Sequence, residues 1–377
     1  MEQYDRIVIG MGAVGTSTVR YLSEGFDEVL GIEKGSIPNP DATSYGLTRL
    51  IQFTSYTDYS YIPILKDAVK DWKRLEKKGN RKVFYDNGTI EICERGTEAM
   101  GETIDFFREA SIDYNFLSDE DINEKYGLFQ LNEEFSAIET ETGGLLDARN
   151  CIETQRKIAI DNGASINTYE EVQKVDQMDG YVRVVTDSQE YEADEVIVCS
   201  GAWTGHLFPR IGDVLTVKNH TYSHFLNGGY NLENEYPAFL VRQQDKPSYY
   251  GLVEPSKDAV KYGVGTDDYE NLIRQPPTHF TRGIETDNNK YEIEAAENHF
   301  GINTSETNRS SCMICYSPDH HPIIGYHPDY ENIIIATGMS GHGFKFSNIT
   351  GSIIKDISLN EDSKYDTQKF SPNRLDI

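Results

Sequence analysis

A glycine-rich turn near the N-terminus constrains the fold of this chain more than any other feature. Residues 6–9 (Arg-Ile-Val-Ile) are typical of a buried strand, and the sequence Gly-Met-Gly-Ala-Val-Gly follows directly at residues 10–15. Residues 13–23 carry a helical pattern, and a second strand at residues 28–32 ends at Glu33. Strand, glycine turn, helix, strand and acid therefore follow one another within about thirty residues, an order that predicts a dinucleotide-binding βαβ unit.

Each glycine of this turn has a physical task. Gly10 permits the tight turn, Gly12 lets the backbone approach a pyrophosphate, and Gly15 lets the helix pack closely on the strand. Ala13 and Val14 open the helix, whose first N–H groups and positive dipole end attract the phosphates. An ordinary strand-to-helix turn can carry the same glycines, but the complete order of elements favours the dinucleotide.

The acid that closes this unit indicates which sugar is bound. Glu33 lies 23 residues after Gly10, where its carboxylate can accept hydrogen bonds from a ribose diol. This favours a 2′-hydroxyl over a 2′-phosphate. We expect the neighbouring Lys34 to contact the cofactor as well.

The composition excludes several classes of protein. The 377 residues include 62 acidic and 35 basic side chains, and the net charge of −27 disfavours binding to nucleic acid. There is no run of about 18 apolar residues, so we expect no membrane span, and the charged N-terminus does not resemble a signal peptide. Five scattered cysteines do not suggest a disulfide framework. We expect a soluble cytoplasmic protein that is a monomer or a weak homodimer.

The middle of the chain is rich in strand signals, whereas an NAD dehydrogenase would continue with further βα units. Residues 83–92 are predicted to form a hairpin around the Asn-Gly pair at 87–88, and residues 181–191 are predicted to form another. The second hairpin leads into a strand at residues 195–199, and we expect Gly201 after it to contact the cofactor.

A second glycine-rich segment follows a strand near the C-terminus. Residues 332–336 are apolar, Thr-Gly-Met-Ser-Gly-His-Gly follows at residues 337–343, and residues 344–357 look helical. Gly341 and Gly343 would let the backbone approach a flavin ring, and the helix would point N–H groups at the pyrimidine edge of that ring. Dinucleotide-binding elements at both ends of the chain indicate an interleaved flavin fold.

Four segments carry a resemblance to a known family. They read Ser-Tyr-Gly-Leu-Thr-Arg at 44–49, Ser-Cys-Met at 311–313, Pro-Asp-His-His-Pro at 318–322 and Ser-Gly-His-Gly-Phe-Lys-Phe-Ser at 340–347. Over nearly its whole length the chain resembles the monomeric sarcosine oxidase and N-methyl-L-tryptophan oxidase family of FAD-dependent amine oxidases, within the D-amino-acid oxidase superfamily.

The resemblance implies an α/β fold in which a Rossmann-like FAD-binding domain is interleaved with an α+β substrate domain built on a mixed β-sheet. The FAD-binding domain is expected to comprise residues 1–85, 145–212 and 308–377, and the substrate-binding domain residues 86–144 and 213–307. The clearest helix expected in the substrate domain spans residues 288–300.

Cys312 matches the cysteine that carries FAD covalently in this family. A thiolate is the nucleophile that such a bond needs, and Cys312 lies in a predicted strand at residues 310–316. Cys315 would face the other side of that strand. The CxxC spacing alone also fits a redox dithiol, half of a zinc site or two core cysteines, although neither a second cysteine pair nor a βαβ setting accompanies it.

The resemblance also implies roles for charged and polar residues. Lys345 corresponds to the lysine that binds the substrate carboxylate, and Arg49 and Thr48 to residues beside the flavin. Lys261 corresponds to the lysine that activates O2 in this family. Such a lysine acts because a cation above the reduced flavin stabilises developing superoxide. Tyr250 matches an active-site tyrosine that can donate to a carboxylate.

Two further expectations concern the adenine and metals. The backbone of Val172 is expected near the adenine, as in the family. His320 and His321 could suggest a metal site, but the neighbouring prolines place them in a loop beside the flavin strand, and we predict no metal.

Four positions depart from the family pattern on the substrate side. Gln52 stands where the family has a second cation for the substrate carboxylate, and an amide offers no charge-assisted fork. Tyr45 and Gly265 replace two histidines, and Ile314 replaces a tyrosine. We expect Gln52 and Tyr45 to contact a substrate that is bulkier or less polar than sarcosine.

The implied reaction is the oxidation of a secondary amine or an N-methyl amino acid. A hydride passes to flavin N5, and O2 reoxidises the flavin with formation of hydrogen peroxide, so a small-molecule amine and O2 are the expected partners. Three alternatives stay open: a dehydrogenase of the same fold with another electron acceptor, a tailoring oxidase that acts on a cyclic imino acid, and a flavin-binding protein without activity.

Overall fold

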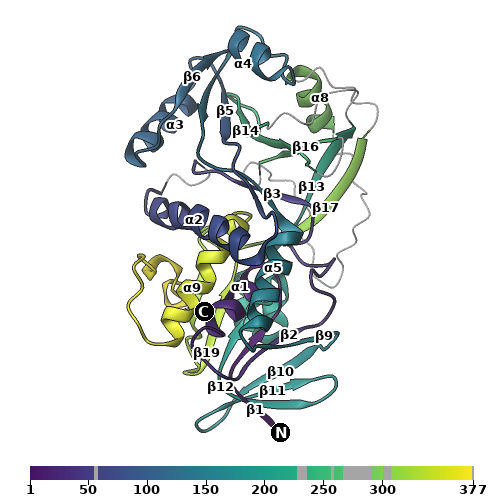
Figure 1. Cartoon of the computed structure of the whole chain (residues 1–377), viewed down its shortest axis with the longest axis vertical. Helices are drawn as coiled ribbons and strands as arrows, with labels where there is room; N and C mark the ends of the chain where they lie inside the picture. The colour runs from purple at the N-terminus through teal and green to yellow at the C-terminus, as the bar shows by residue number, and fades with distance from the viewer. Residues whose placement is uncertain (55–57, 227–235, 256–258, 266–289, 300–306, 376–377) are drawn as a thin grey trace.

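The computed structural model describes residues 1–54, 58–226, 236–255, 259–265, 290–299 and 307–375 (Figure 1). Within these residues the strands form two eight-stranded sheets and one three-stranded sheet. The first sheet lies at the end of the molecule that holds the N-terminus, and the second lies at the opposite end (Figure 1).

The first sheet has the strand path β10-β11-β12-β1-β2-β9, with β19 and β18 branching from β12. Its strands are β1 (Glu2–Ile9), β2 (Val29–Glu33), β9 (Ser165–Thr168), β10 (Val172–Gln177), β11 (Val182–Thr186), β12 (Glu190–Val198), β18 (Ile323–Tyr326) and β19 (Ile333–Thr337). The five strands β9, β2, β1, β12 and β19 run parallel. The strands predicted at both ends of the chain therefore lie together, and the predicted hairpin of β11 with β12 is confirmed.

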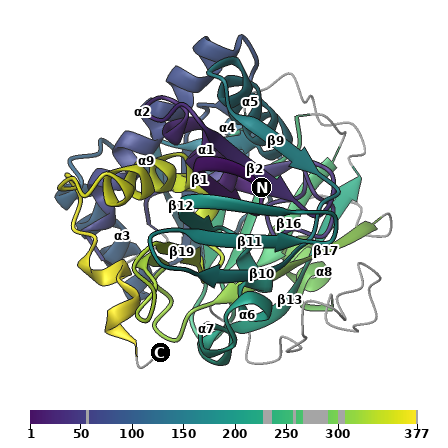
Figure 2. The same cartoon turned by 90° about the horizontal axis from the view of Figure 1, so that it is seen from below.

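Both faces of this parallel sheet are buried, which explains its continuous apolar strands. Val8 faces the cluster that holds Val19 of helix α1 (Ala13–Leu22), whereas Ile7 and Ile9 face the opposite cluster. Helix α1 packs between α5 (Ala148–Asp161) and α9 (Ser347–Ser358), and α2 (Tyr61–Gly79) contacts both of these helices. On the opposite face, β10 and β11 pack near the short helices α6 (Thr204–Leu207) and α7 (Pro209–Val214) (Figure 2).

The second sheet has the order β17-β13-β16-β15-β14-β5-β7-β6 and is mixed, because β14 and β5 pair in parallel. Its strands are β5 (Thr89–Glu94), β6 (Asn115–Ser118), β7 (Phe135–Thr140), β13 (Thr216–Leu226), β14 (Ala238–Arg242), β15 (Tyr249–Val253), β16 (Ala259–Val264) and β17 (Thr307–Tyr316). Helices α3 (Glu98–Glu109), α4 (Asp119–Tyr126) and α8 (Lys290–His299) lie at this end of the molecule (Figure 1).

A predicted helix and a predicted domain boundary can be compared with this part of the structure. The predicted helix at 288–300 corresponds to α8, with positions 288, 289 and 300 outside the described residues. The predicted domain boundary at residue 308 falls inside β17, which pairs with β13 along its whole length.

The hairpin predicted at residues 83–92 is wrong, although its strands exist. Strand β4 (Phe84–Tyr85) pairs with β8 (Gly144–Asp147), which also pairs with β3 (Thr48–Ile51) in the three-stranded sheet. Strand β5 instead pairs with β14 and β7 in the second sheet. The turn at Gly88, with a φ of 77°, thus carries the chain from one sheet to the next, because each strand finds a better-matched distant partner.

Candidate functional site

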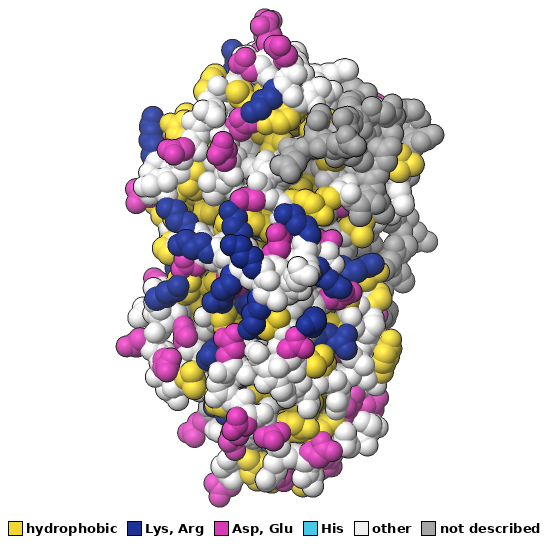
Figure 3. Space-filling model, in the orientation of Figure 1, with side chains coloured by type: hydrophobic (Ala, Val, Ile, Leu, Met, Phe, Trp, Pro, Cys, Tyr) yellow, Lys and Arg dark blue, Asp and Glu magenta, His cyan; other side chains and the backbone are white. Residues whose placement is uncertain are grey.

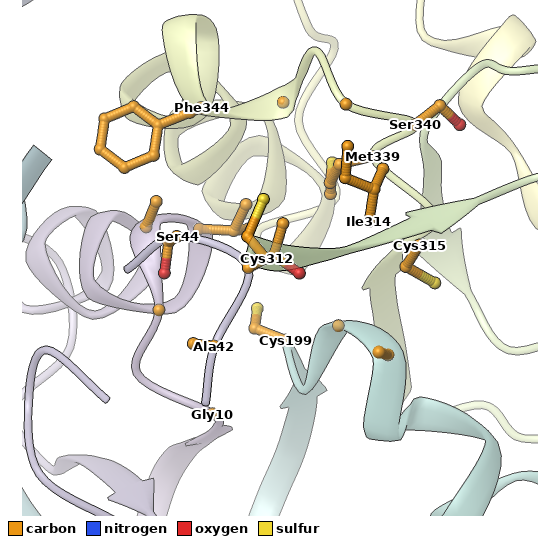
Figure 4. A pocket seen from close by; sticks show the side chains of 18 of the residues that line it. Gly10, Ala42, Ser44, Cys199, Cys312, Ile314, Cys315, Met339, Ser340 and Phe344 are labelled. Carbon is orange, nitrogen blue, oxygen red and sulfur yellow. The ribbon is translucent and has the colours of Figure 1, made fainter. Parts of the chain in front are cut away.

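A cavity of about 800 Å³ runs from the turn between β1 and α1 to the inner face of the second sheet. Its lining comes from both sheets and from the segment after β19, where a 3₁₀ helix spans Gly343–Phe346. Figure 4 shows Gly10, Cys199 and Phe344 arranged around Cys312, which projects from β17. Segments from the start, middle and end of the chain therefore build one site.

The glycine turn has the geometry that its sequence predicts. Gly10 has a φ of 91°, which favours glycine, and a Cβ on Gly15 would lie 1.8 Å from the carbonyl oxygen of Gly10. Gly12 precedes α1 without a capping side chain, and Ala13 and Val14 also line the cavity. The helix therefore directs its first N–H groups at the cavity without a competing side chain, which fits a pyrophosphate.

Glu33 and Lys34 line the same end of the cavity. The Glu33 carboxylate accepts hydrogen bonds from the N–H of Met11 (2.8 Å) and from Asn39 Nδ2 (2.8 Å), so it is held firmly at the turn. Lys34 Nζ lies 3.7 Å from the centroid of the Trp203 ring, and burial lowers its pKa. A carboxylate oxygen has more than one lone pair, so Glu33 can still accept from a ribose hydroxyl.

The opposite wall is one face of the second sheet. His220 on β13 is directly opposite Cys312 on β17, and residues opposite each other on neighbouring strands project to the same face. His220 Nε2 shares a hydrogen bond with Tyr250 Oη (3.0 Å). Burial, together with Lys261 and Arg49, lowers the pKa of His220 to about 3, so this imidazole is neutral.

Tyr250 depends on a glycine beneath it. Tyr250 pairs with Gly263 across β15 and β16, and a Cβ on Gly263 would lie 2.7 Å from the Tyr250 hydroxyl oxygen. The phenol ring therefore lies flat on the strand with its hydroxyl turned to His220.

Lys261 is a buried cation on this wall, only 4% exposed. Its Nζ donates to the carbonyl oxygen of Thr48 (3.2 Å) and lies 4.4 Å from the centroid of the Tyr222 ring. Burial and Arg49 lower the pKa of Lys261 to about 8, and the charge of Glu254 opposes this shift. Lys261 is therefore protonated at neutral pH despite its burial.

Glu254 lies behind the cavity wall and contacts Thr48 and His224. It is fully buried, accepts a hydrogen bond from the Thr48 hydroxyl (2.7 Å) and lies 3.3 Å from His224 Nε2. Burial raises the pKa of Glu254, but His224, Lys261 and Thr48 together hold it below its ordinary value. The carboxylate is thus ionised and supports the charge of Lys261.

Arg49 and Lys345 enter the cavity from another side. Arg49 donates to the carbonyl oxygens of Thr43 (2.8 Å) and Tyr45 (2.6 Å), and its guanidinium lies 5.5 Å from the centroid of the Phe344 ring. Lys345 is 4% exposed, and its Nζ donates to the carbonyl oxygen of Gln52 (3.4 Å). Backbone carbonyls therefore hold both cations at the cavity wall.

The structure brings most of the predicted site residues together. Those that line the cavity are Gly10, Gly12, Ala13, Val14, Glu33, Lys34, Arg49, Gln52, Val172, Gly201, Tyr250, Lys261, Cys312, Gly341, Gly343 and Lys345. Gly15, Thr48 and Tyr45 are not among the lining residues: Gly15 packs against Gly10, Thr48 bonds Glu254, and Tyr45 contributes its carbonyl to Arg49.

Among the residues of the site that sequence reasoning missed are His220, Tyr222, Arg242 and Glu254. His220, Tyr222 and Arg242 line the cavity, and Glu254 lies behind it. His220 is opposite Cys312 only because β13 pairs with β17, and no local pattern in either strand indicates this pairing.

The described part of the chain holds no group of three or more His, Cys, Asp or Glu side chains suited to a metal ion. None of its helices is both long and apolar enough to cross a bilayer.

Comparisons with known proteins identify the family and the fold. The model of the family described as FAD dependent oxidoreductase matches residues 5–357. Monomeric sarcosine oxidase of Arthrobacter sp. (strain TE1826) is 28% identical over 379 residues, which cover 99% of this chain and 97% of the relative. N-methyl-L-tryptophan oxidase of Yersinia pestis (strain Pestoides F) is 27% identical, with 99% of each chain covered.

Among solved structures, NikD, described as an unusual amino acid oxidase essential for nikkomycin biosynthesis, has a TM-score of 0.84 at 20% identity. The match covers 99% of this chain and 98% of NikD, and it shows a shared fold. The family resemblance and the fold class predicted from the sequence are confirmed by these matches.

Proposed function

The chain belongs to the family of FAD-dependent oxidoreductases, and we propose that it is an oxidase of secondary amines, in particular of N-methyl amino acids. FAD bound in the cavity would supply the two-electron acceptor, which O2 then reoxidises with release of hydrogen peroxide. The observation that carries the proposal is Lys261, a buried cation that lines the same cavity as Cys312. We propose a cytoplasmic monomer or weak homodimer that acts on a small-molecule amine.

The residues of the cavity would bind and orient the amine. Lys345 offers a cation for a carboxylate, and Tyr250 offers a hydroxyl whose direction His220 sets. His220 is neutral, so it adds no further positive charge to the wall that holds Lys261 and Arg49. Arg49, held by three carbonyls, would contribute positive charge beside the flavin site. Positioning and electrostatics are the contributions that a flavoprotein makes to such chemistry.

We propose that Cys312 forms a thioether bond to the 8α carbon of FAD: this carbon would lose a proton, the flavin would take up the two electrons, and O2 would reoxidise it. Cys312 and two other cysteines line the cavity. Burial raises the pKa of Cys199 to about 12 and that of Cys315 to about 11, so both stay protonated and unreactive. The charge of Lys261 and that of a Cys312 thiolate would attract each other.

Acid precipitation tests the covalent bond. The yellow colour of the wild-type protein is expected to stay in the pellet, and Cys312→Ser is expected to release FAD into the supernatant. Cys315→Ser is the matched control and should keep the colour in the pellet. Free FAD from the wild-type protein would contradict the bond without contradicting the oxidase function.

Anaerobic mixing with a panel of amines tests the function itself. The panel should include sarcosine, bulkier N-methyl amino acids and cyclic imino acids, because the substrate positions Gln52, Tyr45, Gly265 and Ile314 depart from the family pattern. Bleaching of the flavin by at least one amine, followed by recovery and peroxide formation when O2 enters, is the expected result. Bleaching that only an artificial electron acceptor reverses would identify a dehydrogenase, and a flavin that no amine bleaches would contradict the proposal.

A further inference from the structure

The charged side chains that line the cavity are separated by sign. Its carboxylates are Glu33, Asp41, Glu170 and Glu171, and three of these interact with Lys34 at the dinucleotide end. The other charged side chains among the described lining residues are four cations, Arg49, Arg242, Lys261 and Lys345. The part of the cavity that these cations line is therefore suited to an anionic ligand in addition to the flavin.

Arg242 is the one of these four cations to which neither the sequence pattern nor the resemblance gives a role. We infer that Arg242 holds the substrate carboxylate together with Lys345 and replaces the cation that Gln52 does not supply. The inference rests on the proposed function and narrows it to amines that carry a carboxylate.

The strand register places Arg242 beside Tyr250. Leu240 on β14 is opposite Tyr250 on β15, and Arg242 lies two residues further along β14, on the same face. Both Leu240 and Arg242 line the cavity. The guanidinium thus belongs to the wall that carries the Tyr250 hydroxyl.

Arg242 and Lys345 hold the same short stretch of backbone. Lys345 Nζ donates to the carbonyl oxygen of Gln52, and Arg242 Nη2 donates to that of Thr54 (3.1 Å). The Cα atoms of residues two apart can be separated by at most about 7 Å. Lys345 therefore bonds the backbone of Gln52, the position where the family places its second cation, and Arg242 bonds the backbone two residues further on.

The replaced positions leave room for a ligand beside Arg242. The N–H of Gly265 donates to the carbonyl oxygen of Ser248 (2.7 Å), and both residues line the cavity. Glycine in place of histidine at 265, next to the small Ser248, keeps this part of the wall open. A substrate longer than sarcosine can extend its carboxylate into this space.

Arg242 is pre-oriented by a buried acid. Its Nε lies 3.5 Å from Glu91 Oε2, and Glu91, 1% exposed, also accepts a hydrogen bond from the Thr54 hydroxyl. Arg242 Nη1 also lies 3.9 Å from Glu102 Oε2. A guanidinium carries five N–H donors in a rigid fork, so a ligand carboxylate can add to the contacts with Glu91 and Thr54 and replace the long contact with Glu102.

Binding of matched ligands to the FAD-loaded protein tests the inference without turnover. Each pair consists of a carboxylate and its carboxamide, namely acetate with acetamide, 2-furoate with 2-furamide, and indole-3-acetate with indole-3-acetamide. Perturbation of the flavin absorption spectrum gives the dissociation constants. Arg242→Gln is expected to weaken carboxylate binding about tenfold or more, as for the loss of a charge-assisted hydrogen bond, and to leave carboxamide binding within about twofold.

Two further variants allow the test to be interpreted even if Arg242→Gln is unstable. Arg242→Gln leaves Glu91 buried without its cation, so the double variant Arg242→Gln/Glu91→Gln provides a folded protein if the single variant is unstable. Adding Gln52→Arg to either variant is expected to restore carboxylate binding. Equal losses for carboxylates and carboxamides, unchanged carboxylate binding, or a wild-type protein that binds no carboxylate of the panel would overturn the inference. A flavin that no amine bleaches would instead contradict the proposed function, whatever these ligands do.

Discussion

At the scale of single residues, the charge of Lys261 depends on its buried neighbours. Burial and Arg49 favour the neutral amine, whereas Glu254 favours the ammonium, and the balance lowers the pKa to about 8. Glu254 can do this because Thr48 and His224 keep it ionised in a fully buried position. A lysine poised in this way is cationic below about pH 8 and neutral above it.

Substitution of Lys261 should separate the two halves of the reaction. Lys261→Met is expected to slow reoxidation of the reduced flavin by O2 about 10²- to 10³-fold, the usual loss for a preorganised electrostatic group, and to affect anaerobic reduction far less. Stopped-flow absorption measures both steps. Lys218→Met, on the neighbouring strand over the Tyr316 ring, is the matched control. Equal slowing of both steps would contradict the assigned role.

The pH dependence of reoxidation should follow the same lysine. In the wild-type protein the rate is expected to fall as the pH rises through about 8, because the ammonium is lost. Glu254→Gln removes the charge that raises this pKa, so the decline should move to lower pH. A decline that stays at the same pH in Glu254→Gln would show that Lys261 does not control it.

At the scale of elements, the site depends on backbones that approach each other closely. The β1–α1 unit needs Gly15 because the helix crosses the strand end at the carbonyl of Gly10. The β15–β16 pair needs Gly263 because the Tyr250 ring lies on it. In both places glycine is needed because it has no side chain, so that two elements can pack closely, and not because of its wider range of backbone conformations.

Gly15→Ala should damage the dinucleotide site specifically. The added Cβ would meet the Gly10 carbonyl at 1.8 Å, so α1 must move away, at a cost of about 1–3 kcal/mol or more in folding free energy and with loss of FAD binding. Gly101→Ala in α3 is the control, because a Cβ there meets nothing within 4 Å and alanine favours a helix. Thermal unfolding and FAD titration measure the two effects. Normal FAD affinity in Gly15→Ala would contradict the assigned packing.

At the scale of the whole molecule, the charge is distributed unevenly. The net charge is −27, yet Figure 3 shows Lys and Arg side chains gathered across the middle of one face. Helix α2 alone carries Lys66, Lys70, Lys73, Arg74, Lys77 and Lys78. Several pair with nearby acids, such as Lys73 with Asp86 and Lys78 with Glu24, and so bind α2 to its surroundings.

The cavity also links the two ends of the molecule, since both sheets line it. In the Cys312→Ser protein, FAD at a hundred times its dissociation constant is expected to raise the free energy of unfolding by about 2.7 kcal/mol, in one transition for the whole chain. Thermal unfolding at increasing FAD concentration measures this, with AMP as the control that reaches only the dinucleotide end. Two transitions, of which only one responds to FAD, would contradict a cofactor that joins both sheets.

The βαβ unit, the late glycine segment and the family could be predicted from the sequence, because they depend on short-range spacing. The φ of Gly10 and the fit of Gly15 against it follow from residues five apart. The two halves of the misjudged hairpin were also recognisable as strands, since alternation and β-branched residues are local signals.

The strand partners and the substrate wall could not be predicted from local sequence and are visible only in the folded chain. The partners of β4 and β5, the position of His220 opposite Cys312 and the approach of Arg242 to Thr54 all join residues far apart in the chain. Such contacts form because burial of whole sheet faces selects one register among many, and no short stretch of sequence carries that information.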